Sequence, residues 1–143
     1  MADTHASLEM ISWTFVQEYY SFLNKDPARL HRFYTKKSSF LHGHEGEMAS
    51  LCVGQQEIHD KITKLDFRDC KVMVSNVDCQ ASANNGIVIM VLGEMSNNGG
   101  PSQKFVQTFF LAEQPKGYYV LNDIFRFLNE ESDSEASESD EIP

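Results

Sequence analysis

The stretch CKVMVSNVDCQASANNGIVIMVLGEM, residues 70–95, decides the fold because its apolar residues alternate with polar ones. A period of two is typical of β-strands with one buried face. The parity of the apolar residues shifts by one near Ser75–Asn76, which predicts a β-bulge that bends the strand. Asn84–Gly86 predicts a tight hairpin turn, since both central positions of a type I′ turn need positive φ. The stretch therefore predicts two long antiparallel strands.

The pattern continues on both sides of this hairpin. Further along, the turns SNNGGPS and QPKG delimit the strands QKFVQTFFLAE and YYVLNDIFRFL. Toward the N-terminus, apolar steps of three and four residues predict a helix over residues 7–24. Asp26, as a cap, and Pro27 predict a short second helix ending near Tyr34. SSFLH is expected to form a short strand and GQQEIHDKITKLD a third helix. The fold class is α+β, with three helices on a long, bent antiparallel sheet.

The length and composition suit a single globular domain. The chain has 143 residues, of which 41% are hydrophobic and ten are Phe. No apolar run approaches the ~18 residues of a membrane span, and the N-terminus lacks the features of a secretory signal. Cys52, Cys70 and Cys79 form no CxxC pair and are expected to be free, mostly buried thiols. We expect a soluble, cytoplasmic or nuclear protein.

The net charge of −9 is concentrated near the end of the sequence. Residues 130–143 contain seven acids and no base, which leaves 14 acids and 12 bases, or −2, elsewhere. A nearly neutral domain lacks the basic face that phosphate binding needs, so direct nucleic-acid binding is not expected. We divide the chain into a folded domain, residues 1–128, and a disordered acidic tail or linker, residues 129–143. Ser132 and Ser137 each precede an acid by three residues and are candidate phosphorylation sites.

Several longer sequence segments resemble those of a known family. The resemblance rests on FVQEYYSFLNKDPARLHRFYTKKSSFLHG, GQQEIHDKI, FVQTFFLA and YYVLNDIFRF, within residues 11–127. These segments resemble the N-terminal, nuclear transport factor 2-like domain of the Ras-GAP SH3-domain-binding proteins, which are stress-granule scaffolds. Fungal relatives of that family are cofactors of a ubiquitin-specific protease. The resemblance implies a cone-shaped α+β domain that forms a cytoplasmic or nuclear homodimer, without enzymatic activity or a cofactor.

The resemblance also implies a groove beside the first helix that binds short Phe-rich peptides such as Phe-Gly-Asp-Phe. Carried over residue by residue, the peptide-binding positions would be Ile11, Phe15, His31, Arg32, Phe33, Phe109, Leu111, Gln114 and Tyr118. Ile11 and Tyr118 depart from the Val and Phe of the scaffold proteins, which bears on fine specificity. Two buried peptide Phe rings, at roughly 1.5–3 kcal/mol each, would give a micromolar Kd after the cost of ordering the peptide.

The residues themselves leave other interpretations open for several of these positions. Phe15 and Phe33 would also suit core rings, because an aromatic stripe on an amphipathic helix is usually buried. His31 would equally suit a surface or helix-capping position. His42 and His44, in an H-x-H pattern, invite a metal hypothesis with His59, but the sequence positions no third and fourth ligand and we expect no metal.

Two further functional classes deserve comparison with peptide binding. Enzymes on this cone fold use acid–base groups in the cavity, for which Tyr34, His42 and Asp123 are candidates. No nucleophile elbow, phosphate loop or paired-carboxylate motif accompanies them, so structural hydrogen bonds or an interface suit Asp123 better. The nuclear transport factor itself binds Ran-GDP and Phe-rich nucleoporin repeats, and retention of Ran or of a Phe-Gly-Asp-Phe protein would discriminate the two.

The strands VIMVLGEM and KFVQTFFL carry more apolar residues than one buried face needs. A large exposed apolar patch marks an interface. The sequence therefore predicts a twofold, isologous dimer through the outer face of the sheet.

Overall fold

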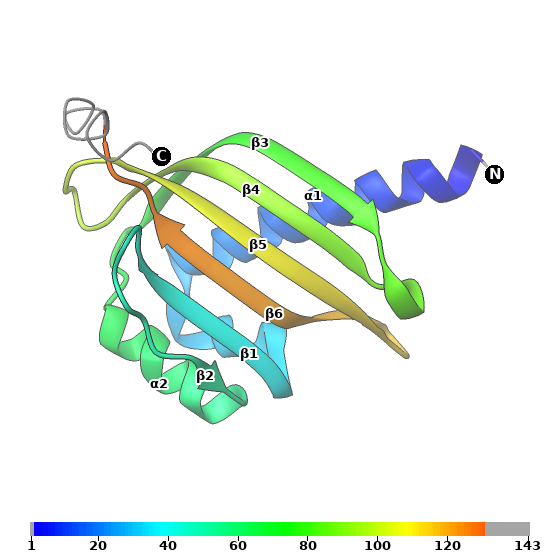
Figure 1. Ribbon diagram of the computed structural model, residues 1–143, viewed down its shortest axis with the longest axis horizontal. Helices are drawn as coiled ribbons and strands as arrows, with labels where there is room; N and C mark the ends of the chain where they lie inside the picture. The colour runs from blue at the N-terminus through cyan, green and yellow to red at the C-terminus, as the bar shows by residue number, and fades with distance from the viewer. Residues whose placement is uncertain (1, 131–143) are drawn as a thin grey trace, which may run out of the picture.

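The computed structural model describes the backbone of residues 2–130 and the side chains from residue 7 onward. Within these residues, two α-helices, two short 3₁₀ helices and six strands follow one another (Figure 1). The helices are α1 (Ala2–Lys25), η1 (Pro27–Phe33), α2 (Gln55–Leu65) and η2 (Ala83–Asn85). The strands are β1 (Tyr34–His44), β2 (Cys52–Val53), β3 (Lys71–Ala81), β4 (Ile87–Ser96), β5 (Gln103–Gln114) and β6 (Gly117–Phe127). The predicted α+β cone is confirmed. The predicted tail phosphorylation sites lie outside the described residues.

All six strands form one sheet in the order β2-β1-β6-β5-β4-β3. Strands β3 to β6 make the predicted antiparallel meander. Strand β1, however, pairs in parallel with β6, so the prediction of a purely antiparallel sheet was wrong at this edge. The reason is topological: α2 and the rest of the meander lie between the two strands in sequence, and such long connections allow parallel pairing.

The bulge and the hairpin lie where the sequence predicts them. The pairing of β3 with β4 shifts register between Val74 and Asn76. At the turn, Asn84 and Asn85 have φ of 54° and 63°, in the left-handed region that asparagine tolerates. The Gly86 amide closes the turn by donating to the carbonyl of Ala83 at 2.9 Å. Local turn chemistry and a shift of parity thus set the register of both strands.

The predicted cap of the second helix is not formed. Asp26 makes no side-chain hydrogen bond to the helix amides, and its carboxylate accepts from the Arg29 guanidinium instead. The segment is a 3₁₀ helix with Pro27 in its first turn. Its Pro is placed as predicted, because a first-turn residue needs no amide donor.

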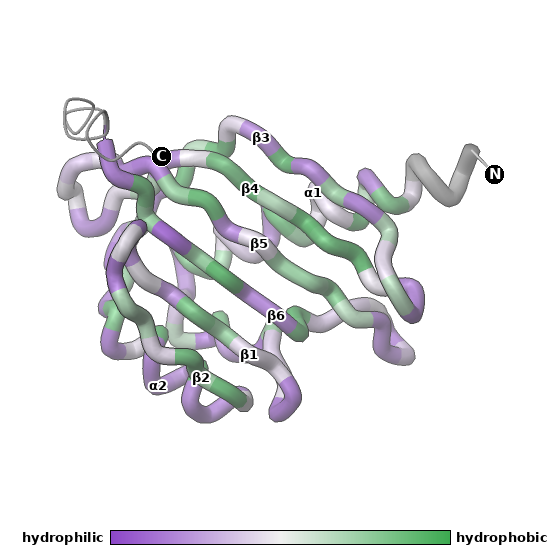
Figure 2. Tube along the Cα trace, viewed as in Figure 1, coloured by the Kyte–Doolittle hydropathy of each residue, from purple (hydrophilic) through white to green (hydrophobic). Residues whose placement is uncertain are grey.

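Helices α1, η1 and α2 cover one face of the sheet, and no described helix covers the opposite face (Figure 1). The core lies between the layers and contains the side chains that point inward at every second position of a strand, such as Ile87, Ile89 and Val91 of β4. Hydrophobic stretches run along β4 and β5 (Figure 2). In the described part of the chain, no helix combines the length and apolar character needed to cross a membrane. The three cysteines are free, and Cys70 is buried.

Candidate functional site

The interior of the cone contains a hydrogen-bonded polar network centred on Asp123. Its carboxylate accepts from the Tyr34 hydroxyl at 2.6 Å and from the Gln107 amide at 2.9 Å. The Tyr19 hydroxyl lies 2.6 Å from that of Tyr34, and the Tyr20 hydroxyl donates to Gln107 Oε1 at 2.6 Å. Burial raises the pKa of Asp123 to about 6, and the hydrogen bonds that its carboxylate accepts only partly offset this increase. Every member of the network has a partner, which is how a core tolerates buried polar groups.

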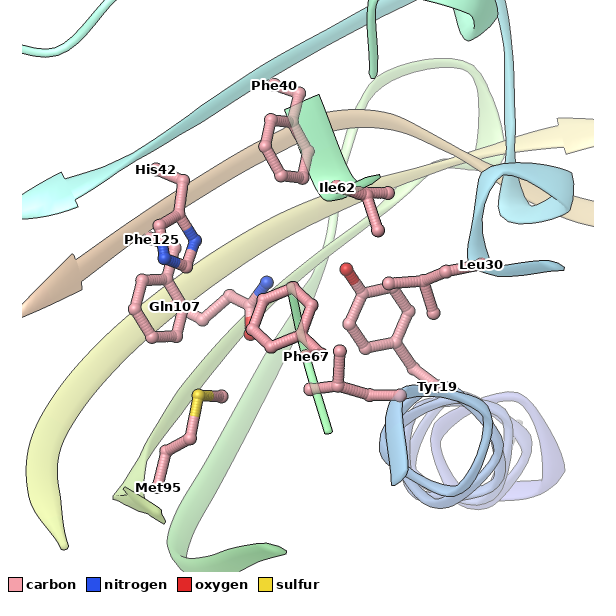
Figure 3. A pocket seen from close by; sticks show the side chains of 10 residues that line it. Tyr19, Leu30, Phe40, His42, Ile62, Phe67, Met95, Gln107 and Phe125 are labelled. Carbon is pink, nitrogen blue, oxygen red and sulfur yellow. The ribbon is translucent and has the colours of Figure 1, made fainter. Parts of the chain in front are cut away.

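The cavity beside this network is almost filled. Its volume is about 10 Å³, enough for roughly one water molecule. Three side chains approach it from different elements: Tyr19 from α1, Phe67 from the loop between α2 and β3, and Met95 from β4 (Figure 3). His42 also lines it, stacked on Phe125 with ring centroids 4.2 Å apart. Of the three acid–base candidates named from the sequence, Tyr34 and Asp123 belong to the network and only His42 lines the cavity. This inner cavity is therefore too small for a substrate, although His42, Phe67 and Met95 also line a more open hollow of about 500 Å³ beside it.

A larger, open groove lies on the other flank of α1. Its volume is about 370 Å³, and the residues lining it are Met10, Ile11, Thr14, Phe15, Glu18, Phe33, Leu111 and Tyr118. Helix α1 forms one wall, and the end of η1 and the strands β5 and β6 contribute the others. Five of the nine positions carried over from the sequence are thus brought together: Ile11, Phe15, Phe33, Leu111 and Tyr118.

Aromatic packing fixes the floor of the groove. Phe109, a sixth predicted position, is fully buried under Phe15, with ring centroids 4.9 Å apart in a T-shaped arrangement. Phe33 meets Phe15 edge to face at 5.8 Å and Phe22 at 5.3 Å. Such edge-to-face pairs stabilise a fixed ring orientation. Phe15 and Phe33 are therefore partly buried against the core and partly open to the groove, which combines the two interpretations made from sequence.

The three remaining predicted positions lie outside the lining of the groove. His31 packs its ring against His59 of α2, 4.3 Å between centroids, and its Nδ1 is 3.1 Å from the Ala28 carbonyl. Arg32 is exposed at the end of η1. Gln114 is exposed at the β5–β6 turn, where its amide donates to the Tyr118 carbonyl at 3.4 Å. The structure places these residues around the groove, not in it.

Sequence reasoning missed three lining residues on α1. Met10, Thr14 and Glu18 follow one another at steps of four, immediately beside the stripe that contains Ile11 and Phe15. Residues separated by four positions share a face of a helix. The spacing of four was visible in the sequence as a second stripe on the helix. The sequence did not show that this stripe borders a groove, because only one side of the helix was expected to contact the rest of the domain.

The histidines named in the metal hypothesis point to different neighbours. His42 stacks on Phe125, His44 lies against Phe127, and His59 packs on His31. Among the residues that the structure describes, no three His, Cys, Asp or Glu side chains gather in a way that could hold a metal ion.

Comparison with known proteins identifies the family. The model of the nuclear transport factor 2 (NTF2) domain matches residues 11–127. The chain belongs to the NTF2 domain family. A G3BP-like protein of Schizosaccharomyces pombe is 67% identical to this NTF2 domain over 132 residues. That alignment covers 92% of this chain and 30% of the relative. A nuclear transport factor 2 of the same organism is 30% identical over 128 residues, 88% of this chain and 97% of that protein.

Solved structures agree with this assignment. The yeast UBP3-associated protein BRE5 superposes with a TM-score of 0.74 at 30% identity, over 84% of this chain and 95% of that one. Nuclear transport factor 2 from Cryptosporidium parvum gives a TM-score of 0.76, also at 30% identity, over 84% of this chain and 94% of that one. These relatives are a G3BP-like protein, two transport factors and a UBP3-associated protein. The NTF2 domain described here spans less than a third of its G3BP-like relative.

Proposed function

We propose that this NTF2 domain is a non-enzymatic, dimeric interaction module that binds short Phe-rich peptides of the Phe-Gly-Asp-Phe kind. The observation that carries the proposal is the groove beside α1, which is apolar, lined by aromatic rings and open to solvent. The small cavity beside the Asp123 network supports the same conclusion, because about 10 Å³ cannot hold a substrate. His31, Arg32 and Gln114 would contact the peptide from the periphery.

The groove suits aromatic anchors energetically. Burying a peptide Phe ring between Phe15, Phe33 and Tyr118 would contribute roughly 1.5–3 kcal/mol of favourable binding free energy. Because Phe109 supports Phe15 from below, the rings of the groove would need little rearrangement on binding. Two such anchors, less the cost of ordering a flexible peptide, correspond to a micromolar Kd, about −8 kcal/mol.

The partner is proposed from the relatives. One structural neighbour, at 26% identity and a TM-score of 0.74, is the complex of the yeast deubiquitinase Ubp3 with its cofactor Bre5. We propose that a ubiquitin-specific protease is likewise a partner here, and that the longer protein acts as a scaffold in cytoplasmic RNA granules, including stress granules. In that scaffold, residues 1–128 would be the interaction domain and the acidic residues 129–143 a linker. Contacts with RNA would belong to other segments.

The outer face of the sheet supports a homodimer. On β4 the outward residues Val88, Met90 and Leu92 alternate with the buried ones. They pair with Phe110, Thr108 and Val106 of β5, so the two strands present a continuous apolar surface. Ile124 of β6 extends it and is 52% exposed in the single chain. We propose a twofold contact through this surface.

A transport function is the weaker alternative. Identity to the G3BP-like relative is 67%, whereas identity to a nuclear transport factor 2 from the same organism is 30%. Binding of Ran-GDP in place of a Phe-rich peptide would reverse this preference.

The proposed function is tested by titrating a fluorescent Phe-Gly-Asp-Phe peptide into the wild-type protein and into Phe33→Trp. The larger ring should fill the groove and abolish micromolar binding, while circular dichroism and sedimentation remain those of the wild type. Leu51→Ala, an exposed residue in the loop before β2, serves as the matched control and should bind normally. Failure of the wild type to bind any Phe-rich peptide would reject the proposal, and Ran-GDP would then be tested.

A further inference from the structure

The groove beside α1 continues beyond the part already described. A second hollow of about 530 Å³ shares Ile11 and Tyr118 with it and extends to the β3–β4 turn. It is lined by Ser7, Leu8, Ile11, Ala81, Ser82, Asn85, Gly86, Ile87, Glu113 and Tyr118. The first hollow reaches Glu18 along α1, and the second reaches Ser7. At 1.5 Å per helical residue this is a track of roughly 16 Å, the span of about five extended residues.

The charges along this track have one sign. Glu18 lies at the end of the first hollow, and Glu113 lies in the second, where its carboxylate accepts from the Asn85 amide at 3.2 Å. Among the side chains that the structure describes, no Lys, Arg or His lines either hollow. Arg32 and Lys116 are exposed nearby, beside Phe33 and at the β5–β6 turn, but neither belongs to the lining. An apolar track with an acid toward each end is complementary to an apolar segment with a base at each end.

We propose that the preferred occupant of this track is an extended peptide of five or six residues with two aromatic anchors and a Lys or Arg flanking them on each side. This inference rests on the proposed function and specifies its ligand. The anchors lie one in each hollow, on either side of Ile11 and Tyr118, which line both hollows. The flanking cations approach Glu18 and Glu113. Peptides with acidic flanks bind more weakly, because the same two carboxylates then repel them.

The size of the preference follows from the exposure of the acids. Glu18 and Glu113 are both exposed, and exposed ion pairs contribute modestly and are screened by salt. Two favourable pairs in one peptide and two repulsive ones in the other give a difference in Kd of roughly tenfold at low ionic strength. The difference narrows at high salt, whereas the contribution of the aromatic anchors does not.

The test compares three labelled peptides, Lys-Phe-Gly-Asp-Phe-Lys, Gln-Phe-Gly-Asp-Phe-Gln and Glu-Phe-Gly-Asp-Phe-Glu, by fluorescence anisotropy. The proteins are the wild type, Glu18→Gln, Glu113→Gln and the double variant. Asp66→Asn is the matched control, because it removes one carboxylate at the end of α2 at a left-handed position that asparagine also favours. This control separates local recognition from the general attraction of a basic peptide to an acidic protein.

We expect the order Lys, Gln, Glu from tightest to weakest in the wild type and in Asp66→Asn. In the double variant the three affinities should converge to within about twofold. Equal affinities of all three peptides for the wild type, or an unchanged order in the double variant, would overturn the inference while leaving Phe-rich peptide binding intact. Tighter binding of the Glu peptide would overturn it in favour of Arg32 and Lys116. Absence of binding by all three would reject the proposed function itself.

Discussion

The two sides of helix α1 use the same residue types for opposite purposes. On one side Val16, Tyr19 and Tyr20 enter a core where a cavity of only about 10 Å³ remains. On the other side Ile11 and Phe15 border a groove of about 370 Å³ that is open to solvent. The Asp123 network has its polar groups paired and the cavity beside it is small, whereas the groove has apolar rings and no covering segment among the described residues. We therefore propose that this NTF2 domain binds its partners in the groove beside α1 and not in the inner cavity.

Phe109 connects the two regions and should give the largest effect on stability. Truncation to Ala removes a fully buried ring and should lower the free energy of unfolding by about 3–5 kcal/mol. Tyr118→Ala, on the open side of the groove, should cost far less. Urea unfolding followed by circular dichroism measures both. Equal losses in the two variants would show that the groove is as much a part of the core as its floor.

The interior should also respond to pH through two groups with opposite effects. Burial lowers the pKa of His42 to about 4, with further contributions from Lys61 and His44, so acidification below pH 6.5 destabilises the fold. Burial raises the pKa of Asp123 to about 6, so the folded state binds a proton more readily than the unfolded one, and acidification below pH 6 stabilises the fold.

Replacing His42 by Phe should uncover this opposition. Lowering the pH from 7 to 4 should change the free energy of unfolding of His42→Phe, relative to that of the wild type, by about 3 kcal/mol in favour of the variant. The reason is that only the wild type has an imidazole that binds a proton more readily in the unfolded chain than in the fold. Urea unfolding at both pH values provides the comparison. A difference that does not change with pH would mean that His42 titrates normally and that the interior is wetter than described.

The outer face of the sheet provides a third region for comparison. Met90 is 37% exposed and lies at the centre of the proposed dimer surface. Met90→Glu would place a charge near its twofold mate and should raise the dimer dissociation constant at least about a hundredfold, or roughly 2.7 kcal/mol. Leu51→Glu, at an exposed position in the loop before β2, is the control. A wild type that sediments as a monomer at micromolar concentration would remove the basis for this surface.

The smallest effect is expected at the mouth of the groove. Tyr118→Ala should weaken a Phe-rich peptide about tenfold, since one aromatic contact of roughly 1–2 kcal/mol is lost. Its dimerisation should remain that of the wild type. Anisotropy titration measures the change, and an unaltered Kd would place the aromatic anchor elsewhere.

Much of the fold could be predicted because its signals are local. The parity shift at Ser75–Asn76 and the asparagines of the β3–β4 turn specify the bulge and the hairpin within a few residues. The parallel pairing of β1 with β6 could not be predicted in this way, because it joins strands far apart in the sequence. The two-residue strand β2 was missed since so short a segment carries no periodicity.

The groove was predicted only in part, because its lining also depends on contacts between segments far apart in the sequence. The resemblance supplied Ile11, Phe15 and Phe33, which the structure brings together. It did not supply Glu18, because which stripe of α1 remains uncovered depends on how η1 and the β5–β6 turn pack around it. Asp26 illustrates the same limit: a residue of the right type before Pro27 binds Arg29 rather than the helix amides.

Methyl and amide NMR of the labelled protein during titration with a Phe-Gly-Asp-Phe peptide tests the central claim most directly. If the groove binds the peptide and the interior is closed, the methyl signals of Ile11 and Leu111 should shift progressively, while those of Ile62 and Met95 beside the inner cavity remain in place. Shifts confined to Ile62 and Met95, with Ile11 and Leu111 unchanged, would contradict the account and return the cone interior to the position of binding site.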